Sequence, residues 1–345
     1  MATFLNSKGE KIAAESVFSA AELMRHSVLQ NSIQQQTGLE IDITNLTYLI
    51  QETAKQKFYT LDLKEYIPIL VGQGAYSKTL TKFREFSNGG EFEDGIVGVA
   101  REARLEETHV STDALTVGIT NWAKENVWNV FDLEYAARSG VWDIVEAKER
   151  ARKRNWDLGI QRTIFLGTKD GTQTGLLNDA STTVNQALLT APLATMSDSA
   201  FQTFCSGLIG AYRTNVAYTE NPNRFVIPDT EYTALATATS LIMPSVSRLE
   251  YMEKTFRLAA NRPDFRILPC AYCQAAQSDG ALSANRYALY NHDVDSIQFN
   301  IPVDYTPTQI NSLEGFNFRN VAYGQFSEPL ILRPKELMYF EVAGS

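Results

Sequence analysis

Cysteine and histidine are scarce in this chain, which has three of each among its 345 residues. Three cysteines are too few for a disulfide framework in a chain of this length, so we expect reduced thiols and synthesis in the cytosol. The histidines do not form a metal-binding motif such as H-E-x-x-H; they are His26, His109 and His292. The sequence therefore predicts neither a metal site nor any other cofactor, and no catalytic histidine.

Long apolar runs are also missing. No window approaches the ~18 uninterrupted apolar residues of a membrane span, and the first eight residues lack the basic and then apolar pattern of a signal peptide. Basic residues are outnumbered, with 31 Lys and Arg against 40 Asp and Glu, and the net charge is −9. Because proteins that grip nucleic acid through its phosphates are usually basic, this balance argues against such a role. An acidic surface also simply promotes solubility.

Catalytic motifs are incomplete or absent. Cys270-Ala271-Tyr272-Cys273 has C-x-x-C spacing. It follows an expected strand, and a redox pair would need a helix N-terminus directly after it, an order that the following residues 274–277 would permit. A zinc site would need about four ligands, and no second pair completes one. We interpret these cysteines as buried structural thiols. The glycines at Gly72-Gln73-Gly74 and at Gly167–Gly171 lack the spacing of nucleotide-binding loops and are predicted to be turns.

The most informative segment present is a long, charged helix predicted over residues 141–165. Its apolar residues recur at helical spacing and form a narrow stripe opposite a wide polar face. At 1.5 Å per residue the helix would be roughly 37 Å long, and it stops at Gly167. The tetrapeptide Gly175-Leu176-Leu177-Asn178 follows shortly afterwards. A rod of this length suits a strut with one side on a sheet.

The rest of the pattern mixes short strands with helices, which indicates an α+β fold. Residues 81–86 and 96–100 flank a Gly-rich turn and are interpreted as a long, highly charged hairpin. Ser197-Asp198-Ser199 is an expected N-cap. Further helices are predicted over 18–36, 46–59, 200–216, 228–240 and 245–257, and further strands over 110–117, 122–130, 225–227, 266–268 and 287–290.

The order of these segments resembles the major capsid proteins of tailed bacteriophages, which have the Hong Kong 97-like fold. No single tetrapeptide is diagnostic, and the ordered series over about residues 75 to 342 carries the resemblance. The segments are Val110–Val117, Trp122–Val130, Phe131–Glu134, the long helix with Phe165-Leu166-Gly167, Gly175–Asn178, Asn223–Pro228 with Tyr232 and Leu235, Arg286–Asn291, Phe299–Val303 and Leu332–Phe340.

The resemblance implies a specific domain organisation. An N-terminal arm would cover 1–60, and a peripheral domain with the long spine helix would cover 61–77 and 108–167. An extended loop would cover 78–107, an axial domain 168–310, and closing strands of the peripheral domain 311–345. The arm and the loop would reach across neighbouring subunits. The subunit-interface residues expected on the loop are Lys82, Arg84, Glu85, Glu93, Arg101 and Arg104.

By the same resemblance, many copies would assemble as pentamers and hexamers into an icosahedral head shell around double-stranded DNA. The shell would not read DNA sequence, and an acidic wall would not trap the packed DNA. Portal, scaffold and decoration proteins are the expected further partners, with assembly in the host cytoplasm and no membrane. Some family members crosslink subunits through a lysine and an asparagine, but no such pair is assigned in this sequence.

Two alternatives remain at this stage. An encapsulin-like compartment would share the fold but hold enzymes in place of DNA. A soluble thiol-dependent enzyme using Cys270 is the alternative from a different class. Length and the loop pattern favour the phage capsid interpretation.

Overall fold

The structure is a computed structural model that describes residues 3–5, 11–13, 57–88, 107–139, 143–239, 245–313 and 315–342. The chain divides into two compact units, Met1–Thr53 and Ala54–Ser345. In the first unit, β1 (Thr3–Leu5) pairs antiparallel with β2 (Lys11–Ala13), a pairing that the weak periodicity of this segment did not predict. The helix predicted over 18–36 and most of the one over 46–59 lie outside the described residues.

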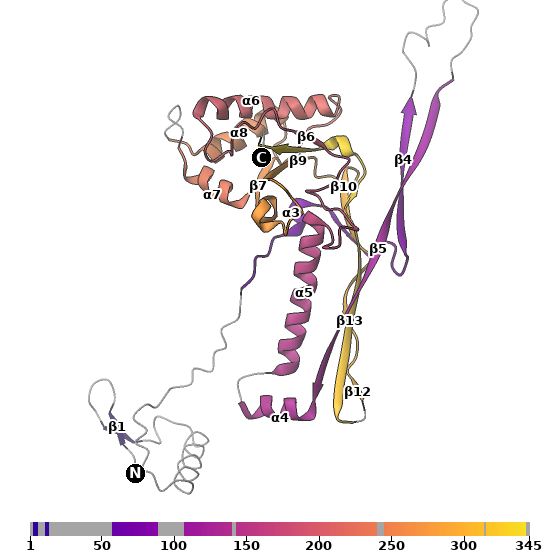
Figure 1. Ribbon diagram of the computed structural model, residues 1–345, viewed down its shortest axis with the longest axis vertical. Coiled ribbons are helices and arrows are strands. Elements are labelled where there is room, and N and C mark those ends of the chain that lie inside the picture. The colour runs from indigo at the N-terminus through magenta and orange to yellow at the C-terminus, as the bar shows by residue number, and fades with distance from the viewer. Residues whose placement is uncertain are drawn as a thin grey trace, which may run out of the picture. The chain divides into compact units, whose positions relative to one another are not determined.

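A long antiparallel sheet dominates one side of the second unit (Figure 1). Its central strand, β5 (His109–Asn129), has 21 residues and is about 70 Å long at ~3.3 Å per residue. The sequence predicted two strands here, at 110–117 and 122–130, and that prediction was wrong because the strand runs through without a break. The strand changes its partner instead. The other strands are β4 (Thr79–Asn88), β11 (Val303–Pro307), β12 (Asn311–Leu313) and β13 (Asn317–Ser327).

The two halves of β5 have different neighbours. Residues His109 to Gly118 pair with β4, and residues Ile119 to Asn129 pair with β13 on the opposite edge. The β4–β5 hairpin therefore uses 109–118 as its second strand. The expectation that 96–100 would form that strand was wrong for the described length of β4, and residues 96–100 themselves lie outside the described residues.

Helix α5 (Ile144–Leu166) lies along the long sheet and follows α4 (Val130–Ser139). Asp143 caps its first turn by accepting hydrogen bonds from the amides of Val145 and Glu146. Helix and sheet meet closely at Gly324 of β13, where an added Cβ would lie 2.5 Å from the Trp156 ring. The predicted strut on a sheet is thus confirmed, and only glycine fits at this crossing.

A second five-stranded sheet, the core sheet, has the strand order β6-β15-β9-β7-β8. Its edge strand β6 is largely exposed, whereas alternate residues of the other four strands enter different hydrophobic clusters on the two faces. In β9, for example, Tyr287 and Leu289 face one cluster while Ala288 and Tyr290 face the other. The strands are β6 (Thr183–Asn185), β7 (Arg224–Pro228), β8 (Arg266–Cys270), β9 (Arg286–Tyr290) and β15 (Leu337–Glu341).

Helices α6 (Asp198–Asn215), α7 (Asp229–Thr237) and α8 (Arg248–Ala260) contribute to the cluster on one face of the core sheet. Ser197 caps α6 as the sequence predicted, accepting a hydrogen bond from the amide of Ala200. The other face packs on the end of α5 and on α3 (Leu63–Tyr66). Short 3-10 turns follow β8 and precede β15, at Ala271–Cys273, Ala275–Gln277 and Pro334–Glu336.

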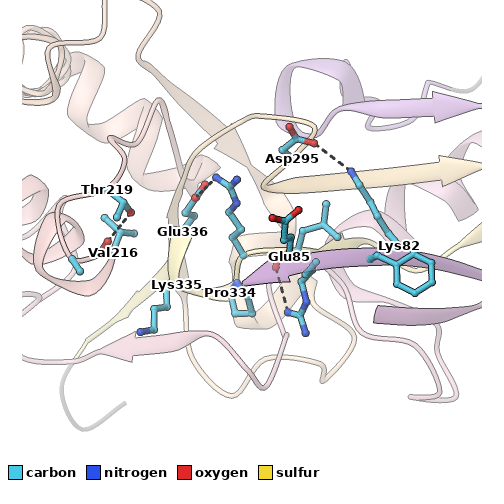
Figure 2. Close-up of a pocket in the computed structure, with 13 residues that line it drawn as sticks. Lys82, Glu85, Val216, Thr219, Asp295, Pro334, Lys335 and Glu336 are labelled. Atoms are coloured by element: carbon cyan, nitrogen blue, oxygen red, sulfur yellow. Dashed lines mark hydrogen bonds and ion pairs between the residues drawn. The ribbon is translucent and has the colours of Figure 1, made fainter. Parts of the chain in front are cut away.

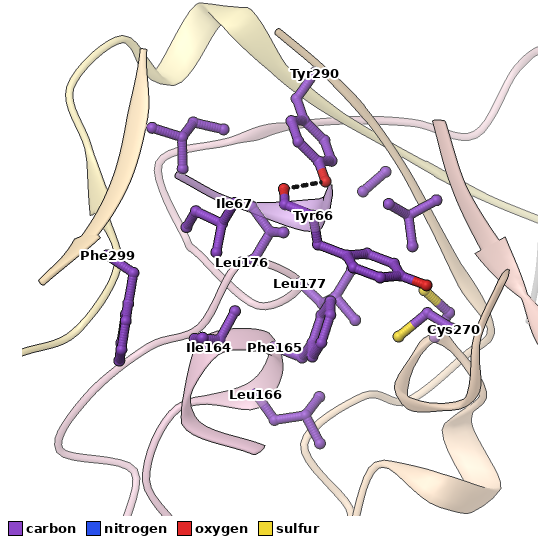
Figure 3. Packing of buried hydrophobic residues seen from close by; sticks show 14 of the residues in the cluster. Tyr66, Ile67, Ile164, Phe165, Leu166, Leu176, Leu177, Cys270, Tyr290 and Phe299 are labelled. Atoms are coloured by element: carbon purple, nitrogen blue, oxygen red, sulfur yellow. Dashed lines mark hydrogen bonds between the residues drawn. The ribbon is translucent and has the colours of Figure 1, made fainter. Parts of the chain in front are cut away.

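The tetrapeptide after α5 closes the C-terminal end of that helix (Figure 3). The amides of Leu176 and Leu177 donate to the carbonyls of Ile164 and Phe165, and Asn178 Nδ2 donates to the carbonyl of Leu166. These are carbonyls that a helix end leaves without an intrahelical partner. Both leucine side chains are fully buried beside α5. The motif is therefore a cap and a core anchor at once.

A small third sheet, with the order β14-β10-β3, joins the two larger ones. Its strands are β3 (Ile69–Val71), β10 (Ile297–Ile301) and β14 (Leu330–Ile331). The last strand, β15, was expected to return to the peripheral sheet, and this was wrong. It pairs with β6 and β9, both within the predicted axial segment, because its strictly buried residues fit a two-sided core and not a half-exposed sheet.

Candidate subunit-contact surface

The base of the β4–β5 hairpin turns one face toward the body of the same chain. Leu80, Lys82 and Arg84 alternate with exposed residues along β4, so their side chains share the inward face. The Lys82 ammonium lies 3.4 Å from a carboxylate oxygen of Asp295 and donates to Gln298 Oε1 at 3.2 Å. Lys82, which was predicted to contact a neighbouring subunit, therefore binds the hairpin to the body of its own chain.

Arg84 has a similar role on the inward face. Its guanidinium pairs with Asp113, directly opposite on β5, and donates to the carbonyl of Leu332 at 3.3 Å. A small apolar cluster lies beside these contacts; it comprises Val117, Leu330, Leu332, Leu80 and Leu115. We call these polar and apolar contacts the hairpin clamp, because together they fix the hairpin to the body.

The outward face of β4 is available for other contacts. Phe83 is 72% exposed. The Glu85 carboxylate has no hydrogen-bond or ion-pair partner in the part of the chain that the structure describes. Figure 2 shows Glu85 turned toward the same space as Asp295 and Glu336. Of the predicted interface residues, Glu85 is thus the one with an uncommitted charge, while Glu93, Arg101 and Arg104 lie outside the described residues.

That space is a groove of about 630 Å³ between β4 and the end of α6, which we call the hairpin groove. Its walls come from segments that are far apart in the sequence, so no local pattern could have predicted it. The lining residues are Lys82, Phe83, Arg84, Glu85, Val216, Ala217, Thr219, Asp295, Leu332, Arg333, Pro334, Lys335 and Glu336.

The turn after α6 forms one wall of the groove in an unusual backbone conformation. Ala217 and Tyr218 have φ angles of 52° and 64°, in the left-handed region that residues other than glycine rarely adopt. Tyr218 is 76% exposed, although aromatic side chains are commonly buried. Strained backbone that displays an exposed aromatic residue is typical of contact sites.

A second exposed surface lies where α4 meets the turn between β12 and β13. The rings of Phe131 and Phe316 are in edge contact with centroids 5.4 Å apart, and Tyr135 lies one helical turn from Phe131. All three side chains are exposed. Phe131 belongs to a segment that carries the family resemblance, but its exposure and its contact with Phe316 were not predicted from the sequence.

The cysteines and glycines that the sequence offered as candidates for chemistry are buried thiols and turn residues. Cys205, Cys270 and Cys273 are buried free thiols. Burial raises the pKa of Cys205 to about 12 and that of Cys273 well above its usual value, so little nucleophilic thiolate forms near neutral pH. No cluster of acidic, histidine or cysteine side chains in the described ranges is able to hold a metal ion. Gly72 and Gly74, with positive φ angles, form a turn after β3.

Comparison with known proteins identifies the family. The model of the major capsid protein family matches residues 100–342. This chain belongs to the major capsid protein family. No curated protein is a match to its sequence. The expected identity as a tailed-phage capsid subunit, a structural protein of the virion, is confirmed.

Solved capsid structures share the fold of this capsid protein at low sequence identity. The capsid of Myoviridae phage XM1 has a TM-score of 0.72 at 18% identity and covers 89% of this chain and 100% of its own. A native GTA particle capsid has a TM-score of 0.57 at 12% identity, covering 89% and 98%. A solved structure from Mycobacterium phage Bobi has a TM-score of 0.56 at 8% identity, again covering 89% and 98%. The capsid protein thus has the predicted α+β, Hong Kong 97-like fold.

The capsid protein has no helix, within the residues that the structure describes, that is long and apolar enough to cross a membrane.

Proposed function

We propose that this capsid protein closes, as pentamers and hexamers of itself, into an icosahedral head shell around double-stranded DNA. It would hold the DNA without reading its sequence, and it would act without catalysis. Its further partners would be a portal, and scaffold or decoration proteins, met in the host cytoplasm. By this proposal, the 1–60 segment is an arm and the 78–107 loop an extension across neighbours, while 168–310 faces the symmetry axes.

The hairpin clamp is the observation that best supports this proposal. Two charged side chains and an apolar cluster hold the base of a two-stranded hairpin that Figure 1 shows extending beyond the helices and short sheets of the second unit. An isolated hairpin is marginally stable in water. A hairpin built at a fixed angle to its body suits a subunit that must reach a neighbour in a defined direction, as closed heterologous assemblies require.

Negative-stain electron microscopy of the purified protein, alone and with its candidate scaffold, tests the shell function directly. We expect closed particles, tubes, or isolated five- and six-membered rings. A uniform monomer or dimer under every salt and scaffold condition would contradict the proposal. The contents of purified particles then separate a DNA shell from an encapsulin-like compartment, because nuclease-protected DNA is expected in the first and enzyme cargo in the second.

The loop residues give a sharper prediction. Reversing Arg101 and Arg104 to glutamate is expected to lower the yield of particles strongly while changing the melting temperature of the isolated subunit little. Surface ion pairs contribute only about 0–1 kcal/mol each, so losing them changes the stability of one subunit little. The shell would repeat the same pairs at every subunit contact, and its assembly is therefore sensitive to charge reversal. Equal damage to assembly and to melting would mean that the loop belongs to the fold of its own subunit.

A further inference from the structure

We propose that Cys270 and Cys273 close into an intrachain disulfide once the protein has left the reducing cytosol, and that this bond stabilises the subunit. The proposal rests on the proposed function for one point only, the change of compartment, since a head shell is assembled inside the host and then released from it. Thiols stay reduced in the cytosol, whereas disulfides form and persist in oxidising surroundings.

The turn after β8 brings the two thiols together. Cys270 is the N-cap of the 3-10 turn Ala271–Cys273, and Cys273 is the third residue of that turn. The side chains of an N-cap and of the third residue after it lie on the same side of a turn, as in a capping box. The Cys273 thiol is hydrogen-bonded to that of Cys270. A bond between the two sulfurs therefore needs little movement of the chain.

The residues around the pair hold this turn in place. The Tyr66 hydroxyl donates to the carbonyl of Pro269 at 2.6 Å, and the Tyr272 ring is stacked on Phe165 of α5 with centroids 5.5 Å apart. Figure 3 shows Tyr66, Phe165 and Cys270 in the same packed cluster. Because the fold already fixes both ends of the new bond, its main effect falls on the unfolded chain, whose conformational freedom it reduces.

The oxidant is a peroxide such as hydrogen peroxide, which is small and uncharged and is able to enter when the cluster opens locally. One cysteine sulfur attacks a peroxide oxygen, the O–O bond breaks, and a sulfenic acid and one water are formed. The other sulfur then attacks the sulfenic sulfur. The S–S bond forms, and the sulfenic hydroxyl leaves with the second thiol proton as another water. The two thiols lose two electrons, which reduce the peroxide.

Burial keeps this reaction slow, so the thiols stay reduced during assembly. Both side chains are 0% exposed. Burial and the neighbouring thiol raise the pKa of Cys273, and the thiolate is the reactive form of a cysteine. The third cysteine, Cys205, belongs to the cluster on the other face of the core sheet. It therefore serves as an internal control for a buried thiol outside the pair.

Differential alkylation of purified particles tests the disulfide. Particles kept in dithiothreitol and particles treated with dilute hydrogen peroxide are unfolded in urea with iodoacetamide and digested with trypsin, which leaves both cysteines of the pair in one peptide, residues 267–286. We expect two alkyl groups on this peptide from the reduced particles. From the oxidised particles we expect none, and a mass lower than that of the unalkylated dithiol peptide by two hydrogen atoms. Cys205 should be alkylated in both samples.

Urea unfolding of the subunit tests the stabilisation. Peroxide treatment should raise the urea midpoint of the unsubstituted chain, and dithiothreitol should reverse the shift. Cys205→Ser should retain the shift because it leaves the pair intact, whereas Cys273→Ser should lose it. The two variants are matched, since each replaces a buried sulfur with oxygen. If Cys273→Ser does not fold, the alkylation of the unsubstituted chain still decides whether the disulfide forms.

The outcomes separate this proposal from the shell function. Alkylation of both cysteines after peroxide treatment, addition of oxygen atoms to the peptide, or a link to a second chain would each overturn the disulfide. An unchanged urea midpoint after closure would overturn the stabilisation. Particles whose pair stays reduced would overturn this proposal alone. Closure of the pair in a chain that never assembles would overturn the shell function alone, because isolated subunits give the same two readouts.

Discussion

Gly175→Ala is expected to cause one of the largest losses of stability among alanine substitutions of the glycines that the structure describes. A Cβ at this position would lie 2.4 Å from the amide nitrogen of Leu166 and 2.5 Å from the carbonyl oxygen of Phe165. Both are backbone atoms at the end of α5, so the clash cannot be relieved by the rotation of a side chain. Overpacking typically costs about 1–3 kcal/mol, and we expect the upper end of that range or more, measured as the free energy of unfolding in urea.

Gly159→Ala is the matched control in the same helix region. Gly159 is exposed within α5, and nothing lies within 4 Å of its added Cβ. Because alanine is favoured over glycine in a helix interior by about 0.8–1.0 kcal/mol, this variant should be as stable as the unsubstituted chain or more so. If both variants unfold at the same urea concentration, the close approach of residues 175–178 to the helix end does not limit stability.

The second large effect is expected at Arg152, which is 2% exposed although it lies on the most charged part of α5. Its guanidinium donates to the carbonyls of Lys124 on β5 and Asn320 on β13, and to the hydroxyl of Tyr305 on β11. The same guanidinium pairs with Glu149, whose carboxylate accepts from the Tyr305 hydroxyl. One side chain thus joins the helix to three strands of the long sheet.

Arg152→Met should therefore lower the free energy of unfolding by about 1–3 kcal/mol, since it removes the hydrogen bonds of a buried charged group and leaves their partly buried acceptors without this donor. The control is Arg150→Met, which loses an exposed pair with Glu146 one helical turn away and should change stability by about 0.3–0.5 kcal/mol. Thermal and urea unfolding of the isolated subunits compare the two. Similar losses for both variants would mean that burying the Arg152 charge costs as much as its contacts contribute.

Gly175 and Arg152 show how much of the structure could be predicted from the sequence. The tetrapeptide Gly175–Asn178 was singled out because of its order after the helix, but its partners on α5 became clear only in three dimensions. The periodicity of α5 did not predict a buried charge at Arg152, because such a pattern is defined by its apolar residues. Its position four residues before Trp156 was the available signal, and its partners lie on strands far away in the sequence.

The candidate site divides in the same way. A charged hairpin could be predicted because alternation and turn residues are local. Its true second strand could not, since 96–100 and 109–118 both have strand-like composition and only pairing decides between them. The opposite roles of Lys82 and Glu85, three residues apart, depend on which face of β4 meets the body. The groove itself is formed by segments that have no sequence relation.

The change of partner along β5 has a mechanical consequence. One unbroken backbone runs from the hairpin into the long sheet, where its second half is hydrogen-bonded along all 11 residues of β13. A pull on the hairpin along the strand direction would load these bonds together, in shear, and would not peel them apart one at a time. A force that a neighbouring subunit applies at the hairpin would therefore be transmitted as tension along β5 into the long sheet.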